Sequence, residues 1–218
     1  MAEDAKLQKE YDNFCAETIS TKQDELCGNN HVFDLEKLII SKILNAKSIL
    51  DIGCGTGHRM FDYYKKENIR FKGVEKFINL IDSSRYKDEI VNADLGSDNF
   101  LNDLNNKLNG FEYDAIVCFG GVVNGFLEYS IKEFGWENLF SLSKGKCPLV
   151  VSFISKKEVF DVSDVGTNYQ LDDNFPHQYL YSKLEILNIL KLNNINVKYI
   201  FQEYTYQDFI LVFLVIGK

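Results

Sequence analysis

Three glycines alternate with other residues at positions 53–57, which read GCGTG. Alternating glycines let a backbone turn sharply, and they let a ligand approach the main chain because no Cβ stands in the way. The preceding residues 48–52 are mostly apolar and predict a short strand, and a helix is expected after the glycines. The helix after the glycines is expected to point its backbone N–H groups at the ligand. Residues 53–57 therefore predict a nucleotide-type site, with a tight turn that binds no ligand as the alternative.

Two common nucleotide motifs do not fit these residues. The dinucleotide motif G-x-G-x-x-G needs a glycine or alanine where His58 stands, and Gly57 comes one residue too early. A phosphate-binding P-loop needs Lys followed by Ser or Thr after its last glycine, and neither follows here. The dinucleotide and nucleoside triphosphate interpretations both lack a required part.

Short apolar strands alternate with amphipathic helices around the glycines. Five strands are expected at residues 48–52, 71–75, 89–94, 113–119 and 148–153. Such alternation is typical of βαβ units, in which a parallel sheet carries helices on both faces. Two further strands, 197–201 and 209–216, predict an antiparallel hairpin at the end of the chain. The expected fold is α/β, with a doubly wound, seven-stranded, mostly parallel sheet that the C-terminal β-hairpin closes.

The remaining segments suggest how the chain is divided. Residues 1–33 are polar with scattered apolar positions, and they predict a helical cap or lid of one or two weak helices. Residues 34–218 are expected to form the ligand-binding domain, beginning with a helix that Asp34 caps and Asn45 ends. Within it, residues 154–181 lack periodicity and predict a long loop on the substrate side. Ser182 and Glu185 form a capping box for a helix at 184–192.

Residues 50–57, LDIGCGTG, resemble motif I of the class I S-adenosylmethionine-dependent methyltransferases, of the small-molecule type. Glu75 ends the second expected strand, 18 residues after Gly57 (75 − 57), and Asp94 ends the third, as in that family. The final strand pair is similar to the reversed hairpin of the family. The resemblance covers roughly residues 35–218. It implies a Rossmann-like methyltransferase fold, S-adenosylmethionine as cofactor and S-adenosylhomocysteine as product.

The resemblance also implies a set of cofactor contacts. Glu75 is expected to accept hydrogen bonds from the ribose hydroxyls, and Asp94, with the Leu95 backbone, to meet the adenine. Asp51 is expected to orient the glycine loop or to meet the methionine amino group. Simpler interpretations are a solvated loop acid for Glu75, a helix N-cap for Asp94 and a strand-end acid bonded to backbone N–H groups for Asp51. The expected cofactor residues are Tyr11, Asp51, Gly53, Cys54, Gly55, Gly57, Glu75, Asp94, Leu95 and Phe119.

Some of these positions have their own alternatives. The backbones of Gly53 and Phe119 are expected beside the methionine moiety. Tyr11 belongs to the N-terminal helix and is expected either to cap the cofactor or simply to pack against the domain.

The segment after the fourth strand is expected to face the substrate. Methyltransferases that act on adenine or glutamine amino groups carry Asn/Asp-Pro-Pro-Tyr/Phe there, whereas this chain has FGGV at 119–122. This departure from the pattern argues against those substrates and favours methyl transfer to O or N of a small metabolite. Asn124 is expected either to touch the substrate or to cap the next helix.

Two residues of the segment 172–179 are expected to contribute to the substrate side. His177 is the expected general base, with an exposed loop histidine as the alternative, and Tyr179 is expected to contact the substrate. His, Cys and carboxylate residues show no metal-ligand spacing, so no metal is expected.

Composition limits the remaining possibilities. The chain has 218 residues, of which 45% are hydrophobic, and a formal net charge of −8, which argues against a nucleic-acid partner. No apolar run approaches the roughly 20 residues of a membrane helix, and residues 1–6 carry no apolar leader. The five cysteines form no C-x-x-C pair and are expected to be reduced in the cytoplasm. RNA or protein methylation and a non-catalytic, cofactor-binding regulator are the alternative functions, and the oligomeric state is open.

Overall fold

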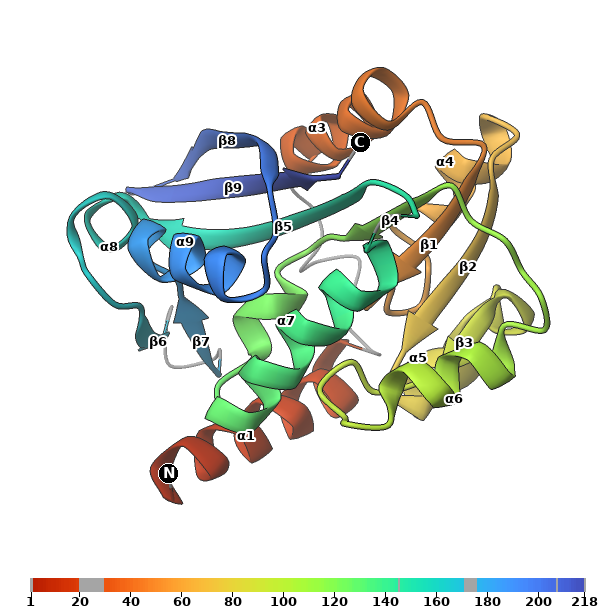
Figure 1. The fold of residues 1–218 in the computed structure, drawn as a ribbon. Coiled ribbons are helices and arrows are strands. Elements are labelled where there is room, and N and C mark those ends of the chain that lie inside the picture. Colours follow the sequence, from red (N-terminus) through yellow and green to blue (C-terminus); the bar gives the residue numbers. More distant parts are fainter. Residues whose placement is uncertain (1, 20–29, 145, 171–175, 207, 218) are drawn as a thin grey trace.

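A seven-stranded sheet forms the centre of the molecule in the computed structural model, which describes residues 2–19, 30–144, 146–170, 176–206 and 208–217 (Figure 1). The strand order is β3-β2-β1-β4-β5-β9-β8. The first five strands run parallel, whereas β9 is antiparallel to both β5 and β8. This arrangement confirms the expected α/β fold with its closing hairpin. The strands are β1 (Ser48–Ile52), β2 (Arg70–Glu75), β3 (Ile90–Asn92), β4 (Ala115–Cys118), β5 (Leu149–Lys156), β8 (Val197–Tyr206) and β9 (Phe209–Ile216).

The central strands are apolar on both faces because helices cover both faces of the sheet. All five residues of β1 are buried. One core packs α6, α7 and α9 against the sheet, and the other packs α3 and α4 against the opposite face (Figure 1). The helices are α1 (Ala2–Phe14), α3 (Asn30–Ile39), α4 (Phe61–Lys66), α5 (Ile78–Ser83), α6 (Phe100–Lys107), α7 (Tyr129–Ser143), α8 (Lys157–Val162) and α9 (Lys183–Leu192).

The helix before β1 begins earlier than the sequence predicts. It starts at Asn30, so Asp34 lies inside α3, where it pairs with Lys37, and does not cap the helix. The end is as expected: Asn45 adopts the left-handed conformation (φ 46°) and its N–H donates to the Ile40 carbonyl after a final π turn. A polar residue at an interior, exposed helix position can look like a cap in the sequence.

Residues 154–181 are not the single irregular loop that the sequence predicts. They contain the end of β5, helix α8 and a two-stranded antiparallel sheet of β6 (Thr167–Gln170) and β7 (His177–Leu180). All four residues of β6 are partly or fully exposed. Strands of this kind have no buried apolar face, so the sequence shows no alternation by which to recognise them. Residues 171–175 lie outside the described part of the chain.

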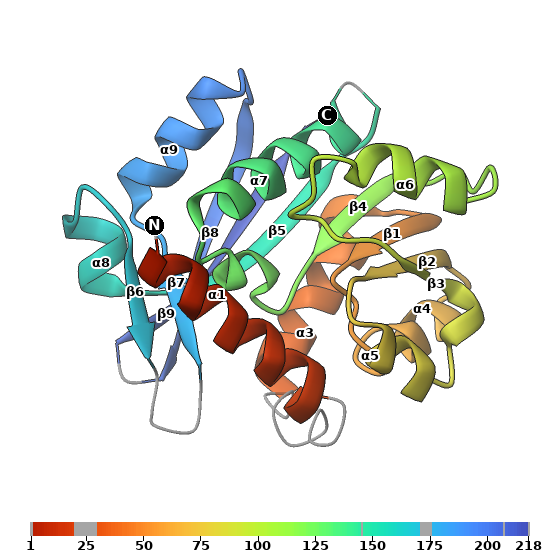
Figure 2. The same ribbon diagram turned by 90° about the horizontal axis from the view of Figure 1, so that it is seen from below.

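The N-terminal helix α1 lies across the edge of the sheet (Figure 2). It passes in front of the segment between β4 and α7, and β7 contacts it. A π turn, Cys15–Ile19, follows α1, and residues 20–29, which belong to the predicted cap, lie outside the described part. None of the helices in the described ranges has the length and apolar character needed to cross a membrane.

Candidate functional site

A cavity of about 190 Å³ lies at the carboxyl edge of the parallel strands. Its walls come from the ends of β1, β2, β3 and β4, and α1 with its following turn adds Gln8, Tyr11, Asp12 and Cys15 to the lining. This is the edge at which open α/β sheets bind their ligands. The expected cofactor residues that line the cavity are Tyr11, Asp51, Gly53, Cys54, Gly55, Glu75, Asp94, Leu95 and Phe119.

The glycine loop shapes the cavity by the absence of side chains. Gly53 has φ +69°, and a Cβ at this position would lie 2.3 Å from Cγ2 of Val122. The N–H groups of Gly53 and Cys54 donate to the Val74 carbonyl, at 2.7 and 3.2 Å. These two N–H groups thus join the loop to β2 and are not available to a ligand. The missing Cβ of Gly53 makes room for the Val122 side chain, which also lines the cavity.

Gly57, the remaining expected cofactor residue, does not line the cavity. It has φ +71°, and a Cβ there would lie 2.3 Å from Cδ2 of Phe61. The Phe61 ring packs on Phe71 with ring centroids 4.4 Å apart. Gly57 is therefore required by the packing of α4 and has no direct contact with the proposed ligand space.

Glu75 joins the end of β2 to the glycine loop. Its Oε2 accepts a hydrogen bond from the Gly55 N–H at 3.0 Å, and its Oε1 accepts from the Lys76 and Phe77 N–H groups at 2.8 and 2.9 Å. Burial raises the pKa of this carboxyl group, and the three hydrogen bonds oppose the rise. A carboxylate offers about four acceptor sites. Roughly one acceptor site is left for a ligand hydroxyl. Binding two ligand hydroxyls at once therefore requires that one of them share Oε2 with the Gly55 N–H.

Asp51 lies buried at the end of β1 and faces the cavity. Its Oδ2 accepts a hydrogen bond from the Tyr64 hydroxyl at 2.9 Å. Burial raises the pKa of Asp51 to about 7; the Tyr64 hydrogen bond opposes the rise, Glu36 adds to it and Arg59 opposes it. Its partner is thus a side chain, and not the backbone N–H groups of the simpler interpretation.

Asp94 and Leu95 form the wall that follows β3. The exposed Asp94 accepts a hydrogen bond from the Gly96 N–H through Oδ1, at 2.9 Å. Helix α6 begins only at Phe100, so Asp94 closes a local turn and is not its N-cap. The Leu95 side chain is buried, and its carbonyl accepts from Asn138 at 2.8 Å.

The cover formed by α1 is anchored on both sides of the cavity. Gln8 accepts hydrogen bonds from the Leu127 and Glu128 N–H groups at 2.8 and 3.2 Å, and Asp12 pairs with Lys76 at 2.8 Å. The ring of Tyr11 covers Gly125, where a Cβ would lie 2.3 Å from its Cε1. The cavity is smaller than the roughly 300–1,000 Å³ typical of small-molecule pockets. A nucleoside-sized ligand therefore needs α1 to shift.

Two charged residues that the sequence reasoning missed form an ion pair at the cavity. Arg59 lines the cavity, and its Nη2 donates to Oε1 of Glu36 at 2.7 Å. Glu36 is completely buried, and burial raises its pKa to about 7 while Arg59 opposes the rise. The one signal in the sequence is a carboxylate among the apolar positions of the helix before β1.

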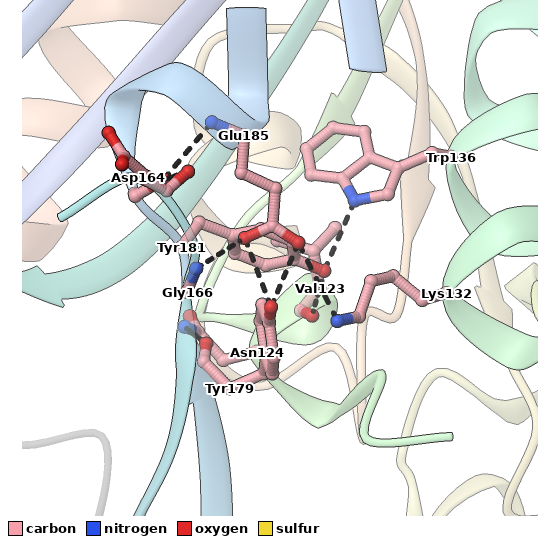
Figure 3. Close-up of polar contacts among 10 residues, drawn as sticks. Val123, Asn124, Lys132, Trp136, Asp164, Gly166, Tyr179, Tyr181 and Glu185 are labelled. Atoms are coloured by element: carbon pink, nitrogen blue, oxygen red, sulfur yellow. Dashed lines mark hydrogen bonds and ion pairs between the residues drawn. The ribbon is translucent and has the colours of Figure 1, made fainter. Parts of the chain in front are cut away.

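None of the three residues expected on the substrate side is among the described residues that line the cavity. Figure 3 shows two of them, Asn124 and Tyr179, among their polar contacts. Asn124 is buried, and its side-chain amide forms hydrogen bonds with backbone groups. It donates to the Ile154 and Tyr179 carbonyls and accepts from the Ile154 N–H. The Tyr179 hydroxyl donates to Glu185, and His177 begins β7 opposite Gln170. The structure thus engages Asn124 of η4 and Tyr179 of β7 in hydrogen bonds within the protein. His177, at the start of β7, is not among the described residues that line the cavity.

These contacts belong to a polar network that fixes the short helix η4 (Val122–Gly125) (Figure 3). Trp136 donates to the Tyr181 hydroxyl at 3.1 Å, which donates in turn to the Val123 carbonyl at 3.1 Å. Lys132 lies 3.1 Å from the centre of the Tyr179 ring, and burial lowers the pKa of its ammonium group. Because Val122 and Gly125 line the cavity, the network supports one wall of it.

Comparison with known proteins assigns the fold. No family model matches the sequence, and no curated protein matches it. Magnesium protoporphyrin IX methyltransferase from Synechocystis PCC 6803, with bound SAM, is similar at 14% identity over 97% of each chain, with a TM-score of 0.63. The 1,6-didemethyltoxoflavin-N1-methyltransferase of Burkholderia thailandensis, with its named substrate and S-adenosylhomocysteine bound, is 12% identical over 96% of this chain and 90% of its own, with a TM-score of 0.62.

The cyclase SpnF is a third similar structure, 10% identical over 97% of this chain and 96% of its own, with a TM-score of 0.68. These likenesses, together with the strand order, show that the chain has the Rossmann-like fold of class I S-adenosylmethionine-dependent methyltransferases. Within the described residues, no group of three His, Cys, Asp or Glu side chains is arranged to hold a metal ion.

Proposed function

We propose that this protein binds S-adenosylmethionine and transfers its methyl group to O or N of a small metabolite. One observation carries the proposal: residues from α1 and from the ends of four neighbouring strands, far apart in the sequence, line a single cavity. The fold, which known methyltransferases share, supports the same conclusion.

The order of the strands suggests how the cofactor lies. From β3 to β4 the strand ends span three spacings, or roughly 14 Å, along which an extended adenosyl ligand can lie. We assign the adenine to Asp94 and Leu95 after β3, the ribose to Glu75 after β2, and the methionine moiety to Gly53 and Phe119 at β1 and β4. Tyr11 covers this ligand from α1.

The residues of the chain have three tasks in such a reaction. When bound, the cofactor supplies a methyl carbon that its sulfonium already activates for displacement. The protein must bind it, align the acceptor behind the methyl carbon and exclude water. The buried wall formed by η4 and the cover formed by α1 are suited to the last two tasks. No histidine is among the described residues that line the cavity, so the proposal does not depend on His177 as a base.

The small-molecule assignment rests on three supports. The FGGV segment after β4 lacks the motif that accompanies methylation of adenine or glutamine. Two structures with this fold are named for methyl transfer to small molecules, 1,6-didemethyltoxoflavin and magnesium protoporphyrin IX. The net charge of −8 disfavours a nucleic-acid substrate. The proposal includes the cytoplasmic location that is expected from the sequence.

A second candidate is a protein that binds the cofactor and does not transfer its methyl group. The observation in its favour is the similarity to SpnF, which is named for a cyclisation and has a TM-score of 0.68. Both candidates predict the same cofactor site and differ only in turnover.

The test combines binding with turnover. S-adenosylhomocysteine and S-adenosylmethionine are titrated by calorimetry, and release of S-adenosylhomocysteine is then measured over a panel of small amines, phenols and acids, with tRNA and peptide pools alongside. Binding with turnover of one small acceptor supports the proposal. Turnover only with tRNA or peptide contradicts the small-molecule assignment, binding without any turnover favours the second candidate, and absence of binding at millimolar ligand contradicts both.

A further inference from the structure

Arg59 and Glu36 place two opposite charges beside the cavity in a largely dry environment. Glu36 reaches the site from α3, on the face of the sheet away from α7, and its side chain is 0% exposed. The Arg59 side chain, between the glycine loop and α4, is 20% exposed and lines the cavity. Their 2.7 Å contact is a charge-assisted hydrogen bond.

This ion pair is incomplete as it stands. Among the described residues, buried Oε2 of Glu36 and buried Nε of Arg59 have no hydrogen-bond partner of good geometry, although the Gly120 backbone N–H lies close enough to the Glu36 carboxylate to oppose the rise of its pKa. Native proteins leave few buried polar atoms unpaired, because each one loses its interaction with water without replacement. A buried ion pair is moreover weak evidence for stability, since desolvation offsets the attraction. The unpaired donor of Arg59 is explained by an anionic ligand whose binding uses the held guanidinium.

The position of Arg59 beside the residues that follow β4 indicates which part of a bound cofactor it would contact. Arg59 lies beside Gly120, the second residue after β4; a Cβ on Gly120 would lie 3.2 Å from Nη1 of Arg59. Among the described residues of the cavity wall, the other cation is Lys76, which follows β2 and is already paired with Asp12. Arg59 is therefore the cation at the β4 end, where the methionine moiety is assigned.

We infer that Arg59 binds the α-carboxylate of the methionine moiety and that Glu36 is the positioning residue that holds the Arg59 guanidinium for it. This inference rests on the proposed function. The planar guanidinium has five N–H donors and matches a carboxylate in two-point geometry. Glu36 occupies Nη2, which fixes the plane of the group while Nη1 stays on the Gly120 side. The buried Asp51 nearby is suited to the ammonium group of the same amino acid.

The inference is tested with two ligands that differ in the amino-acid part. S-adenosylhomocysteine carries the carboxylate, whereas 5′-methylthioadenosine keeps the adenosine and sulfur but lacks the amino acid. Both are titrated calorimetrically into wild-type protein and Arg59→Met. The variant is expected to bind S-adenosylhomocysteine about 10- to 100-fold more weakly, the loss of a charge-assisted contact, and methylthioadenosine within twofold of wild type. Arg85→Met is the matched control, because Arg85 pairs with Asp62 outside the cavity.

The role of Glu36 is tested by the same ratio of affinities. Glu36→Leu removes the acceptor, so we expect S-adenosylhomocysteine to bind about 5- to 10-fold more weakly with methylthioadenosine unaffected. Glu36→Gln keeps an oxygen that can accept from Nη2 of Arg59, and it should restore most of the affinity. A residue with a merely structural role would weaken both ligands together.

Several results would overturn the inference while leaving the proposed function intact. One such result is that Arg59→Met binds S-adenosylhomocysteine as tightly as the wild-type protein. The same result is expected if Arg59 binds an acidic substrate and not the cofactor. Another is equal weakening of both ligands. If Arg59→Met does not fold, Arg59→Lys replaces it, with about a 10-fold selective loss expected because lysine cannot match the two-point geometry; no loss overturns the inference. Failure of wild type to bind either ligand instead contradicts the proposed function.

Discussion

Glu75→Gln is the substitution that separates the ligand role of this carboxylate from its structural role most clearly. In the wild-type protein, Oε1 accepts from Lys76 and Phe77, and Oε2 accepts from Gly55 at 3.0 Å. A glutamine can keep its carbonyl oxygen on the first two N–H groups. Its amide NH₂ then faces the Gly55 N–H, donor against donor, and no anionic acceptor remains for a ribose hydroxyl.

The size of the effect follows from these contacts. A hydrogen bond to a charged group contributes about 1.5–3 kcal/mol. Losing one such bond to the ligand weakens binding about 10- to 150-fold. Losing the bond to Gly55 costs folding a similar amount, which for a chain of this length lowers the melting temperature by about 3–12 °C.

The assay is calorimetric titration with S-adenosylhomocysteine, carried out below the melting temperature of the variant. Glu89→Gln is the matched control: Glu89 pairs with Lys72 at 2.8 Å, its side chain is 42% exposed, and it lies outside the cavity wall. We expect the control to bind like wild type. A Glu75→Gln variant that binds within twofold of wild type would refute the ribose assignment, and equal losses in both variants would refute the claim that the effect is local.

Three further predictions concern the loop, the buried acid and the covering helix. Gly53→Ala and Gly110→Ala both place alanine at positive φ, a strain of about 1–2 kcal/mol, but only Gly53→Ala adds a clash with Val122. Urea unfolding should therefore show a loss of stability about 1–3 kcal/mol larger for Gly53→Ala than for Gly110→Ala. Equal losses of stability would contradict this prediction. Burial raises the pKa of Asp51 to about 7, above the roughly 3.9 of the same residue in the unfolded chain. Between these two values the native state binds a proton that the unfolded state does not. The contribution of Asp51 to stability therefore falls as pH rises from about 4 to 7. Urea unfolding at pH 5 and 7 should therefore show Asp51→Asn losing less stability than wild type over this interval; parallel losses contradict it. Gln8→Ala removes the acceptor for the Leu127 N–H, so hydrogen exchange in α1 should rise several-fold relative to α7, and unchanged exchange would show that this anchor does not hold the helix.

Much of the fold could be predicted from the sequence because its signals are local. The strands β4 and β9 are continuous apolar runs, and β1 is apolar apart from Ser48 and Asp51. Ser182 accepts from the Glu185 N–H at 3.0 Å, as the capping box predicts. The hairpin of β6 and β7 could not be found, because its partly exposed residues carry no apolar alternation. Pairing between such strands depends on neighbours that the local sequence does not contain.

In the candidate site, too, some residues have local sequence signals and others do not. Glu75 and Asp51 follow from strand ends next to a glycine loop, since the carboxyl ends of parallel strands meet at one edge. Arg59 and Glu36 meet only because α3 packs beneath the loop, and their positions, 23 residues apart, give no hint of contact. Asn124 shows the reverse: its place after β4 suggests a ligand contact, whereas its amide bonds carbonyl groups of β5 and β7, a pairing that the local sequence does not indicate.

A crystal structure of the protein grown with S-adenosylhomocysteine tests the central claim most directly. We predict the ligand in the cavity beneath a displaced α1, with its ribose hydroxyls on Glu75 and its adenine beside Asp94 and Leu95. An S-adenosylhomocysteine molecule found elsewhere on the protein, or in the cavity with its ribose turned away from Glu75, would contradict the account.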